Sequence, residues 1–139
     1  MPDQAQSHYH DIAAIAAKFP DTAETMLVDT YLSDAPQASA RVFKIFHPLP
    51  AHFHRNCDEH LYLYSGELLF QIGDNEPQVL RPGQLVTFTR DTVHAILEVR
   101  KEPAIFMSFD TPRRAPDDVT FVALSPGDRK FVSPLSDYL

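Results

Sequence analysis

The stretch "HFHRNCDEHLYLYSG", residues 52–66, holds three of the chain's seven histidines, a glutamate and its single cysteine. His52 and His54 are two residues apart, so on a strand both side chains point to the same face and can share one ion. Glu59 lies five residues after His54 and would face the other way on a straight strand. The intervening "RNCD" contains an Asn and an Asp, which favour a turn, and a turn or bulge there returns Glu59 to the face of the histidines.

A fourth ligand is expected from His94, forty residues after His54. Antiparallel hairpins can bring a strand at 93–99 alongside the strand that carries the first two histidines. Imidazole nitrogens and a carboxylate oxygen suit divalent iron, manganese, nickel, copper or zinc. Three His and one carboxylate also leave open positions for water or substrate on a six-coordinate ion, so the pattern predicts a working metal site.

The segments around this stretch predict an all-β domain with a short N-terminal helix. The helix is expected in "DIAAIAAKF" at 11–19, with Asp11 as N-cap and Pro20 as stop. From residue 25 onward, short runs rich in β-branched and aromatic residues alternate with Pro, Gly, Asn and Asp, which is typical of a sandwich or barrel. The expected strands are 25–32, 41–47, 50–54, 59–65, 67–72, 77–80, 85–89, 93–99, 104–110 and 119–123.

The two His-containing segments resemble the motifs of the cupins. Residues 52–66 read as His-x-His, four residues, Glu, six residues, Gly, as in the first cupin motif, and "GQLVTFTRDTVH" at 83–94 has the spacing of the second. The resemblance implies a double-stranded β-helix, or jelly-roll barrel. It also implies that His52, His54, Glu59 and His94 bind one divalent transition metal, Fe, Mn, Ni or Zn. The expected organisation is an N-terminal extension at 1–24, a cupin barrel at 25–124 and a tail at 125–139.

The sequence departs from the cupin motifs at four positions. Phe46 replaces a glycine before the first histidine, and Thr89 and Asp91 replace the Pro and Gly of the second motif. These three positions concern backbone bends. Glu98 replaces the closing Asn; it lies four residues after His94, so on a regular strand the two share a face. Glu98 is therefore a candidate acid, base or hydrogen-bond partner of a ligand histidine, unless it sits in water at the barrel mouth.

Several other residues are candidates for the walls of the pocket. Arg90 lies in the turn before His94 and is expected either on the surface or as a clamp for a substrate carboxylate. Phe88 and Ile96 are expected to bind substrate, and two further apolar side chains are candidate wall residues: Phe106 and Met107.

Other residues in the opening stretch are expected outside the site. His60 follows Glu59 and should point to the opposite face. Cys57 is expected to be a bystander, since thiol dioxygenases of the cupin family use three His without the Glu. Leu61 and Leu63 share the face of Glu59 and should line the interior, while Tyr62 and Tyr64 pack outside (both pairs in "LYLY" at 61–64).

Composition limits the partners. A net charge of -7 on 139 residues leaves no broad basic surface for nucleic acid. No apolar run approaches the roughly 20 residues that span a bilayer, and "MPDQAQSHYHD" at 1–11 lacks the features of a signal peptide. A cytoplasmic protein without membrane partners is expected. Small cupins commonly dimerise, so a homodimer is expected, with strand 25–32 available to pair with a neighbouring subunit.

Three functions remain open from the sequence. The first is a metal-dependent enzyme acting on a small molecule, above all an Fe(II)-type dioxygenase with an oxygen-rich substrate. The second is isomerase, lyase or decarboxylase chemistry within the same pocket, in which the metal polarises a carbonyl. The third is a non-catalytic module that binds a sugar or an organic acid through the metal.

Overall fold

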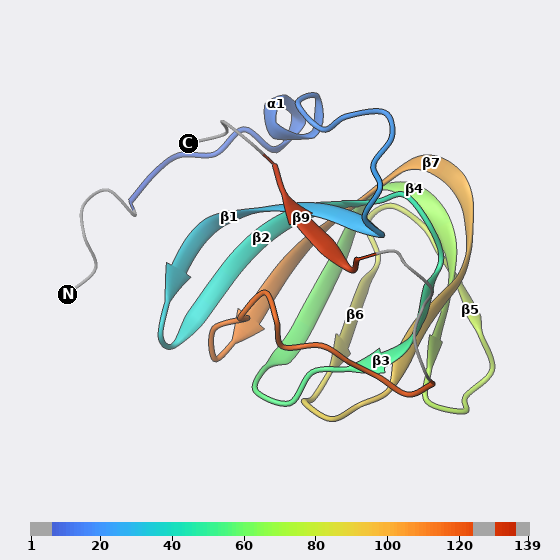
Figure 1. Ribbon diagram of the computed structural model, residues 1–139. Coiled ribbons are helices and arrows are strands. Elements are labelled where there is room, and N and C mark those ends of the chain that lie inside the picture. Colours follow the sequence, from blue (N-terminus) through green and yellow to red (C-terminus); the bar gives the residue numbers. More distant parts are fainter. Residues whose placement is uncertain (1–6, 124–129, 136–139) are drawn as a thin grey trace.

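The computed structural model describes residues 7–123 and 130–135. In these ranges a single short helix precedes a set of strands that curl into a barrel (Figure 1). The elements are α1 (Ile12–Ala16), β1 (Leu27–Ala35), β2 (Ala38–Ile45), β3 (Leu49–Phe53), β4 (Asp58–Ile72), β5 (Gln78–Leu80), β6 (Leu85–Phe88), β7 (His94–Thr111), β8 (Thr120–Phe121) and β9 (Val132–Pro134).

The strands pair in the order β5-β4-β7-β2-β1-β9. β6 adds to β4, while β3 pairs with both β7 and β8 and closes the other side of the barrel. All of these pairs are antiparallel except β1 with β9. The all-β jelly-roll prediction is confirmed.

Two expected strand breaks are wrong. The predicted pair 59–65 and 67–72 forms the one strand β4, and the pair 93–99 and 104–110 forms the one strand β7. Both strands bend where they cross, because their register shifts repeatedly between Leu63 and Leu68. At the bend Gly66 has φ +92°, and a Cβ there would lie 2.7 Å from the Ala104 Cα. Glycine therefore permits a close approach of the two strands instead of ending them.

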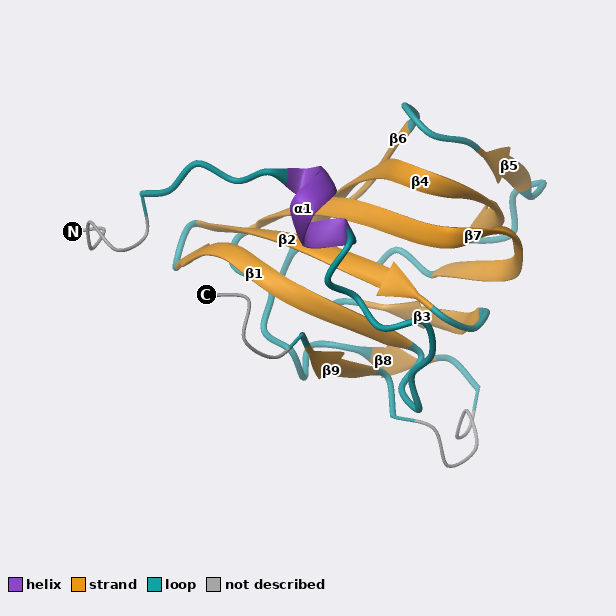
Figure 2. Cartoon of the chain, turned by 90° about the horizontal axis from the view of Figure 1, so that it is seen from above, coloured by secondary structure: helices purple, strands orange, loops and turns teal. Residues whose placement is uncertain are grey.

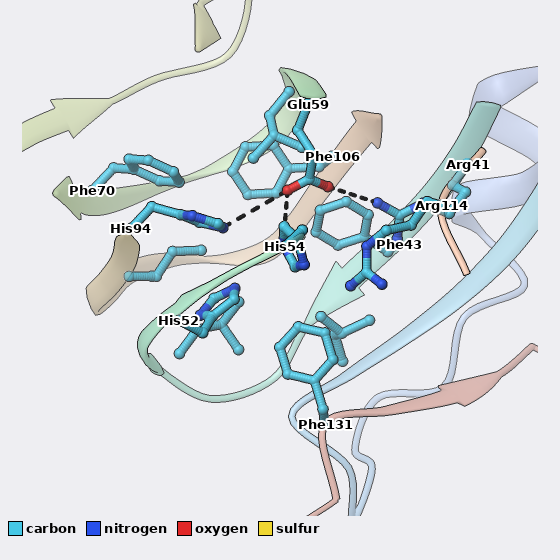
Figure 3. A pocket seen from close by; sticks show the side chains of 14 residues that line it. Arg41, Phe43, His52, His54, Glu59, Phe70, His94, Phe106, Arg114 and Phe131 are labelled. Carbon is cyan, nitrogen blue, oxygen red and sulfur yellow. Dashed lines mark hydrogen bonds and ion pairs between the residues drawn. The ribbon is translucent and has the colours of Figure 1, made fainter. Parts of the chain in front are cut away.

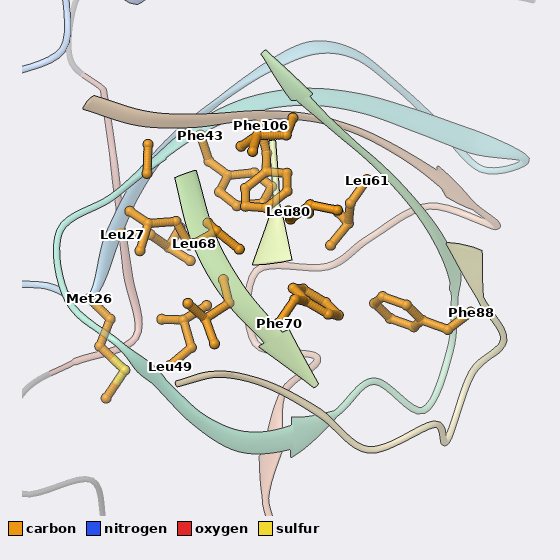
Figure 4. Close-up of a cluster of buried hydrophobic side chains, with 14 residues drawn as sticks. Met26, Leu27, Phe43, Leu49, Leu61, Leu68, Phe70, Leu80, Phe88 and Phe106 are labelled. Atoms are coloured by element: carbon orange, nitrogen blue, oxygen red, sulfur yellow. The ribbon is translucent and has the colours of Figure 1, made fainter. Parts of the chain in front are cut away.

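Apolar side chains fill the interior of the barrel (Figure 4). The alternation predicted for 61–64 is confirmed: Leu61 and Leu63 are buried, whereas Tyr62 and Tyr64 are partly exposed on the outer face. Phe43 and Phe106 stack with ring centroids 5.2 Å apart. This core fills the part of the barrel adjoining the histidines and so keeps their surroundings dry.

The helix α1 covers the outer face of β1 and β2 (Figure 2). Asp11 caps it as predicted, accepting a hydrogen bond from the Ala14 N–H at 3.1 Å. Its Ile15 packs with Val28 and Val42 in a second apolar cluster. No helix within the described ranges is both long and apolar enough to cross a membrane.

Strand β1 is already paired on both edges within its own chain. It lies between β2 and β9, and β9 belongs to a segment that the sequence predicted only as a tail. The pairing with β9 is limited to Leu27–Asp29, so this part of strand 25–32 is closed to a neighbouring subunit, while for the rest of the edge the expected pairing stays a prediction.

Candidate metal centre

Three histidines converge from two neighbouring strands. His52 on β3 faces His94 on β7 directly across the antiparallel pair. His54 follows at the end of β3, and the ring centroids of the three lie between 4.2 and 5.2 Å apart. One potential ligand atom from each lies within 4.8 Å of those of the other two. The expected return of the strand at 93–99 alongside the first two histidines is confirmed.

The turn between His54 and Glu59 is held by a residue from a distant loop. The Asp118 carboxylate accepts the backbone N–H groups of Arg55 and Asn56 at 2.8 and 3.0 Å. The turn thereby places Glu59 on β4, where it is 3% exposed and faces the histidines. Asp91 closes the site from the other side: its N–H donates to the His54 carbonyl at 2.7 Å, and it adopts φ 66°, a conformation that Asp tolerates where the resembling motif has glycine.

Each of the three imidazoles donates one nitrogen to a backbone carbonyl. The Nδ1 atoms of His52, His54 and His94 lie 2.7, 2.6 and 3.0 Å from the carbonyls of residues 50, 118 and 92. Because a carbonyl can only accept, Nδ1 carries the proton in each ring. This bonding fixes the tautomer that offers Nε2 to a metal.

The close contact between the Glu59 carboxylate and the imidazole nitrogens is favourable only if a proton or a cation lies between them. Glu59 Oε1 lies 3.0 Å from His54 Nε2 and 3.7 Å from His94 Nε2 (Figure 3). With Nδ1 protonated, a neutral His54 would direct a lone pair at a carboxylate oxygen. Either a second proton on His54 or a cation shared by the two groups removes this repulsion. The donor set therefore fits a divalent transition metal held by imidazole nitrogen and carboxylate oxygen.

Burial favours the neutral form of His52 and His94, which is the form that binds a metal. Desolvation lowers the pKa of His94 to about 4, and desolvation together with the nearby His94 lowers the pKa of His52 well below its ordinary value. Burial by itself would raise the pKa of Glu59, but the hydrogen bond and charge of His54 and the charge of Arg41 hold it well below the usual range. At neutral pH the site thus presents neutral His52 and His94, each with an unprotonated Nε2, beside a carboxylate.

A buried arginine neutralises the acids behind the site. Arg41 on β2 donates through Nη2 to Glu59 Oε2 at 2.9 Å and through Nε to Asp110 Oδ2 at 2.9 Å. Its Nη1 also lies 3.5 Å from the Asp29 carboxylate. Ser108 donates to Asp110 at 2.7 Å and completes the network. The free Oε1 of Glu59 is consequently left to face the histidines.

The cavity beside these groups is small and mostly apolar. It contains about 340 Å³ not filled by atoms, including its opening to solvent, but the part that a water molecule can occupy is only about 20 Å³, enough for about one water. The wall consists of the three histidines, Glu59, two arginines and apolar side chains: Leu27, Arg41, Phe43, Leu49, His52, His54, Glu59, Leu61, Phe70, His94, Ile96, Phe106, Arg114 and Phe131.

Two of the predicted site residues, Glu98 and Arg90, are exposed to solvent and lie outside this cavity. Glu98 is exposed, because the pairing of β4 with β7 skips Leu97 between Ile96 and Glu98, and this bulge moves Glu98 off the face of His94. Arg90 is also exposed, and its Nε pairs with Asp58 at 3.1 Å. Both residues thus occupy the solvent-exposed positions that were the alternatives to an acid–base role for Glu98 and a substrate clamp at Arg90.

The predicted wall residues divide between the two faces of the sheet. Ile96 and Phe106 line the cavity as expected. Phe88 packs on the ring of His94, with centroids 4.1 Å apart, and supports the ligand without lining the cavity. Met107 borders a hollow on the outer face, with His60 beside it, so His60 points away from the site as predicted.

Cys57 is buried and takes no part in the site. It is 1% exposed, and burial raises the pKa of its thiol to about 12. Its expected role as a bystander agrees with this environment.

The sequence analysis missed several residues that build the site. Arg41 and Lys44 lie on opposite faces of the same apolar strand. The alternation of side chains therefore could not show which of the two cations faces the interior. Arg114 and Asp118 occupy a Pro-rich loop after β7, and Phe131 lies in the segment predicted as a tail. Long-range packing determines where these side chains lie, and the spacing of residues within one segment does not predict it.

The comparisons with known proteins agree with the fold. Residues 45–110 match the family model described as Cupin domain. KdgF from a Halomonas species is 19% identical, with 64% of this chain and 82% of that chain covered and a TM-score of 0.58. A conserved protein with a double-stranded β-helix domain from Klebsiella pneumoniae is 16% identical, with 82% and 96% covered and a TM-score of 0.65. Pac13 from Streptomyces, a nucleoside dehydratase, is 16% identical, with 81% and 85% covered and a TM-score of 0.57. No curated protein matches the sequence.

Proposed function

The chain contains a cupin domain, and we propose that it is a metal-dependent enzyme acting on a small oxygen-rich molecule. One divalent ion, Fe, Mn, Ni or Zn, would be held by His52, His54, His94 and Glu59. The observation that carries the proposal is the convergence of three Nε2 atoms, with their tautomers fixed, beside a buried carboxylate.

Dioxygenation with Fe(II) is the reaction that the residues of this cavity favour most. A bound iron(II) ion would supply open coordination positions for a chelating substrate and dioxygen. Apart from the proposed ligands, the titratable groups in the described wall are Arg41 and Arg114, which stay protonated. The remaining wall is apolar and excludes water. A reaction that needs no separate acid or base therefore suits these residues.

A second candidate is lyase, isomerase or decarboxylase chemistry, which one observation favours. The three histidines form a close group of potential ligands that does not include Glu59. If three imidazoles alone hold the ion, Glu59 Oε1 is free to take a proton from a substrate, with its other oxygen fixed by Arg41 at 2.9 Å. A non-catalytic module for a sugar or an organic acid is the third outcome to be tested.

The experiment reconstitutes metal-stripped protein anaerobically with Fe(II), Mn(II), Ni(II) or Zn(II) and supplies a panel of hydroxy acids, keto acids and polyols. Oxygen uptake and product mass are then recorded. Stoichiometric oxygen uptake with Fe(II) supports the dioxygenase, whereas product formation without oxygen uptake supports the second candidate. Tight binding without any product leaves only the binding module. His60→Ala is the matched control for His52→Ala, because His60 lies on the opposite face.

We also propose that the protein is a homodimer of the cytosol. Support for the dimer comes from an apolar hollow of about 970 Å³, solvent included, on the outer face of the barrel, lined by His60, Tyr62, Leu85, Met107, Phe109 and Thr111. Leu85 is 56% exposed there, and Phe109 is 43% exposed. A second copy covering this face would remove that apolar surface from water. Analytical ultracentrifugation that gives a monomer would contradict the dimer.

A further inference from the structure

Arg114 is a buried cation that forms no ion pair with any carboxylate among the described residues. The residue is 2% exposed and lies in the wall of the cavity with the histidines. Its Nη1 donates to the neighbouring carbonyl of residue 115, and its Nε is the one buried side-chain nitrogen or oxygen without a hydrogen-bond partner in residues 7–123 and 130–135. Taking a guanidinium out of water without a counter-charge is costly.

The acids that surround Arg114 are already committed to other donors. Glu59, Asp110 and Asp29 pair with Arg41, and none of the ion pairs between described residues involves Arg114. Asp118 accepts two backbone N–H groups of the turn that follows His54. Of the two buried arginines here, Arg41 thus has carboxylate partners, whereas Arg114 has no ion pair and faces the cavity.

The position of Arg114 is fixed by its backbone and by an aromatic ring. Its N–H donates to Ser39 Oγ at 3.0 Å, and its carbonyl accepts the hydroxyl of Tyr31. The guanidinium carbon lies 5.9 Å from the centroid of the Phe131 ring. Figure 3 shows this guanidinium beside Arg41 and over Phe131, at the side of the cavity next to His54. It is therefore a fixed fork of donors directed at the space that a ligand would occupy.

We propose that Arg114 is the anion-binding residue of this cavity and that the ligand is a small carboxylic acid. One carboxylate pairs with the Arg114 guanidinium, and a second oxygen function meets the histidine group. Guanidinium and carboxylate match in shape and charge, and a pair screened from water is stronger than one at the surface. Because the rest of the wall is apolar, the carbon chain that joins the two ends is short and uncharged, and wall side chains must move apart to admit it. This inference rests on the proposed function, because it names the substrate class for the same cavity.

The test compares malonate with its monoamide, malonamate, which keeps one carboxylate and loses the other. Each is titrated by calorimetry into protein loaded with zinc, which is redox-inert, and the metal content is measured separately. Wild-type protein is expected to bind malonate about 10- to 100-fold more tightly than malonamate. Arg114→Gln should lose this preference while retaining its zinc. Arg113→Gln is the matched control, because Arg113 is exposed and pairs with Asp34 through Nη2 at 3.0 Å; it should keep the preference.

Several results would overturn the inference. A wild-type protein with equal affinity for the two probes would do so, as would an Arg114→Gln variant that keeps the preference. If Arg114→Gln does not fold, Arg114→Lys decides: a reduced preference is expected, because ammonium lacks the planar fork, and an undiminished preference overturns the assignment. Absence of bound zinc would instead count against the proposed function. On such protein the affinity for malonate is compared between wild type and Arg114→Gln, since a carboxylate can pair with the guanidinium without the metal, and equal affinities would overturn the assignment of Arg114.

Discussion

Replacing Arg41 by methionine tests whether the buried charge network stabilises the barrel. Arg41 is 4% exposed and faces three carboxylates, at 2.9, 2.9 and 3.5 Å. Methionine fills a similar volume and leaves Glu59, Asp110 and Asp29 without their counter-charge. Breaking a buried pair from one side costs about 3–5 kcal/mol. Since a domain of this kind is stable by about 5–15 kcal/mol, the variant should lose a large fraction of its stability.

The loss of unfolding free energy in this variant is also expected to depend on pH. In the wild type the folded pKa of Glu59 is below its unfolded value, so its contribution is complete between pH 5 and 7 and is lost only at lower pH. Without Arg41, Asp29 loses the charge that does most to lower its pKa, and burial, which already holds this pKa above its ordinary value, raises it further. The folded variant then binds more protons than the unfolded chain, and its stability falls as the pH rises through the raised pKa. The deficit relative to wild type should therefore be larger at pH 7 than at pH 5.

The assay is urea unfolding followed by far-ultraviolet circular dichroism at pH 7 and pH 5, with chelator present and protein concentration held constant. Subtracting the two proteins at each pH removes, to first order, the titration of the buried histidines. A loss below about 1 kcal/mol at pH 7, or an equal deficit at the two pH values, would refute the reasoning. Arg90→Gln serves as the control, because its pair with Asp58 is exposed and should leave stability unchanged.

Four further predictions concern single sites. His52→Ala should lose stoichiometric metal by mass spectrometry while His60→Ala keeps it, and equal metal content in the two variants would remove His52 from the ligand set. Because the pKa of His94 is about 4 and that of His52 is also lowered, protons on these two histidines should compete little with the metal between pH 7 and 5; zinc affinity, measured with a competing chelator, should fall by at most about tenfold per pH unit, and a steeper fall contradicts this. Gly66→Ala places a Cβ 2.7 Å from backbone atoms at φ +92° and should cost at least about 1–3 kcal/mol, seen as a lower melting temperature, so an unchanged melting temperature would be incompatible with the close crossing of β4 and β7. The buried Cys57 thiol, with a pKa of about 12, should react with a disulfide reagent only after denaturation; rapid reaction of the native protein would show that the turn opens.

The candidate ligands could be predicted because their spacing depends on local geometry. Residues two apart on a strand share a face, which paired His52 with His54, and the turn formers between His54 and Glu59 indicated the reversal. Alternation likewise separated the inner Leu61 from the outer Tyr62. Each of these inferences needs only a few consecutive residues.

Predictions from the same alternation failed where the strands are irregular. Glu98 should share the face of His94 on a regular strand, but the bulge at Leu97 shifts it outward. The break expected at Gly66 is a bend within one long strand. A bulge depends on how two distant strands fit together, so the sequence of either strand alone does not specify it.

The sequence by itself determined the β architecture and the three histidines with their carboxylate. Only the tertiary structure decided what surrounds them: the pairing of Arg41 with Glu59, the support of the His54 turn by Asp118, and the unneutralised Arg114 in the cavity wall. The difference lies in how far apart in the sequence the interacting residues are. Side-chain direction along a strand follows from local backbone geometry, whereas burial and neutralisation of a charge depend on which remote segments close around it, and only the folded barrel brings those segments together.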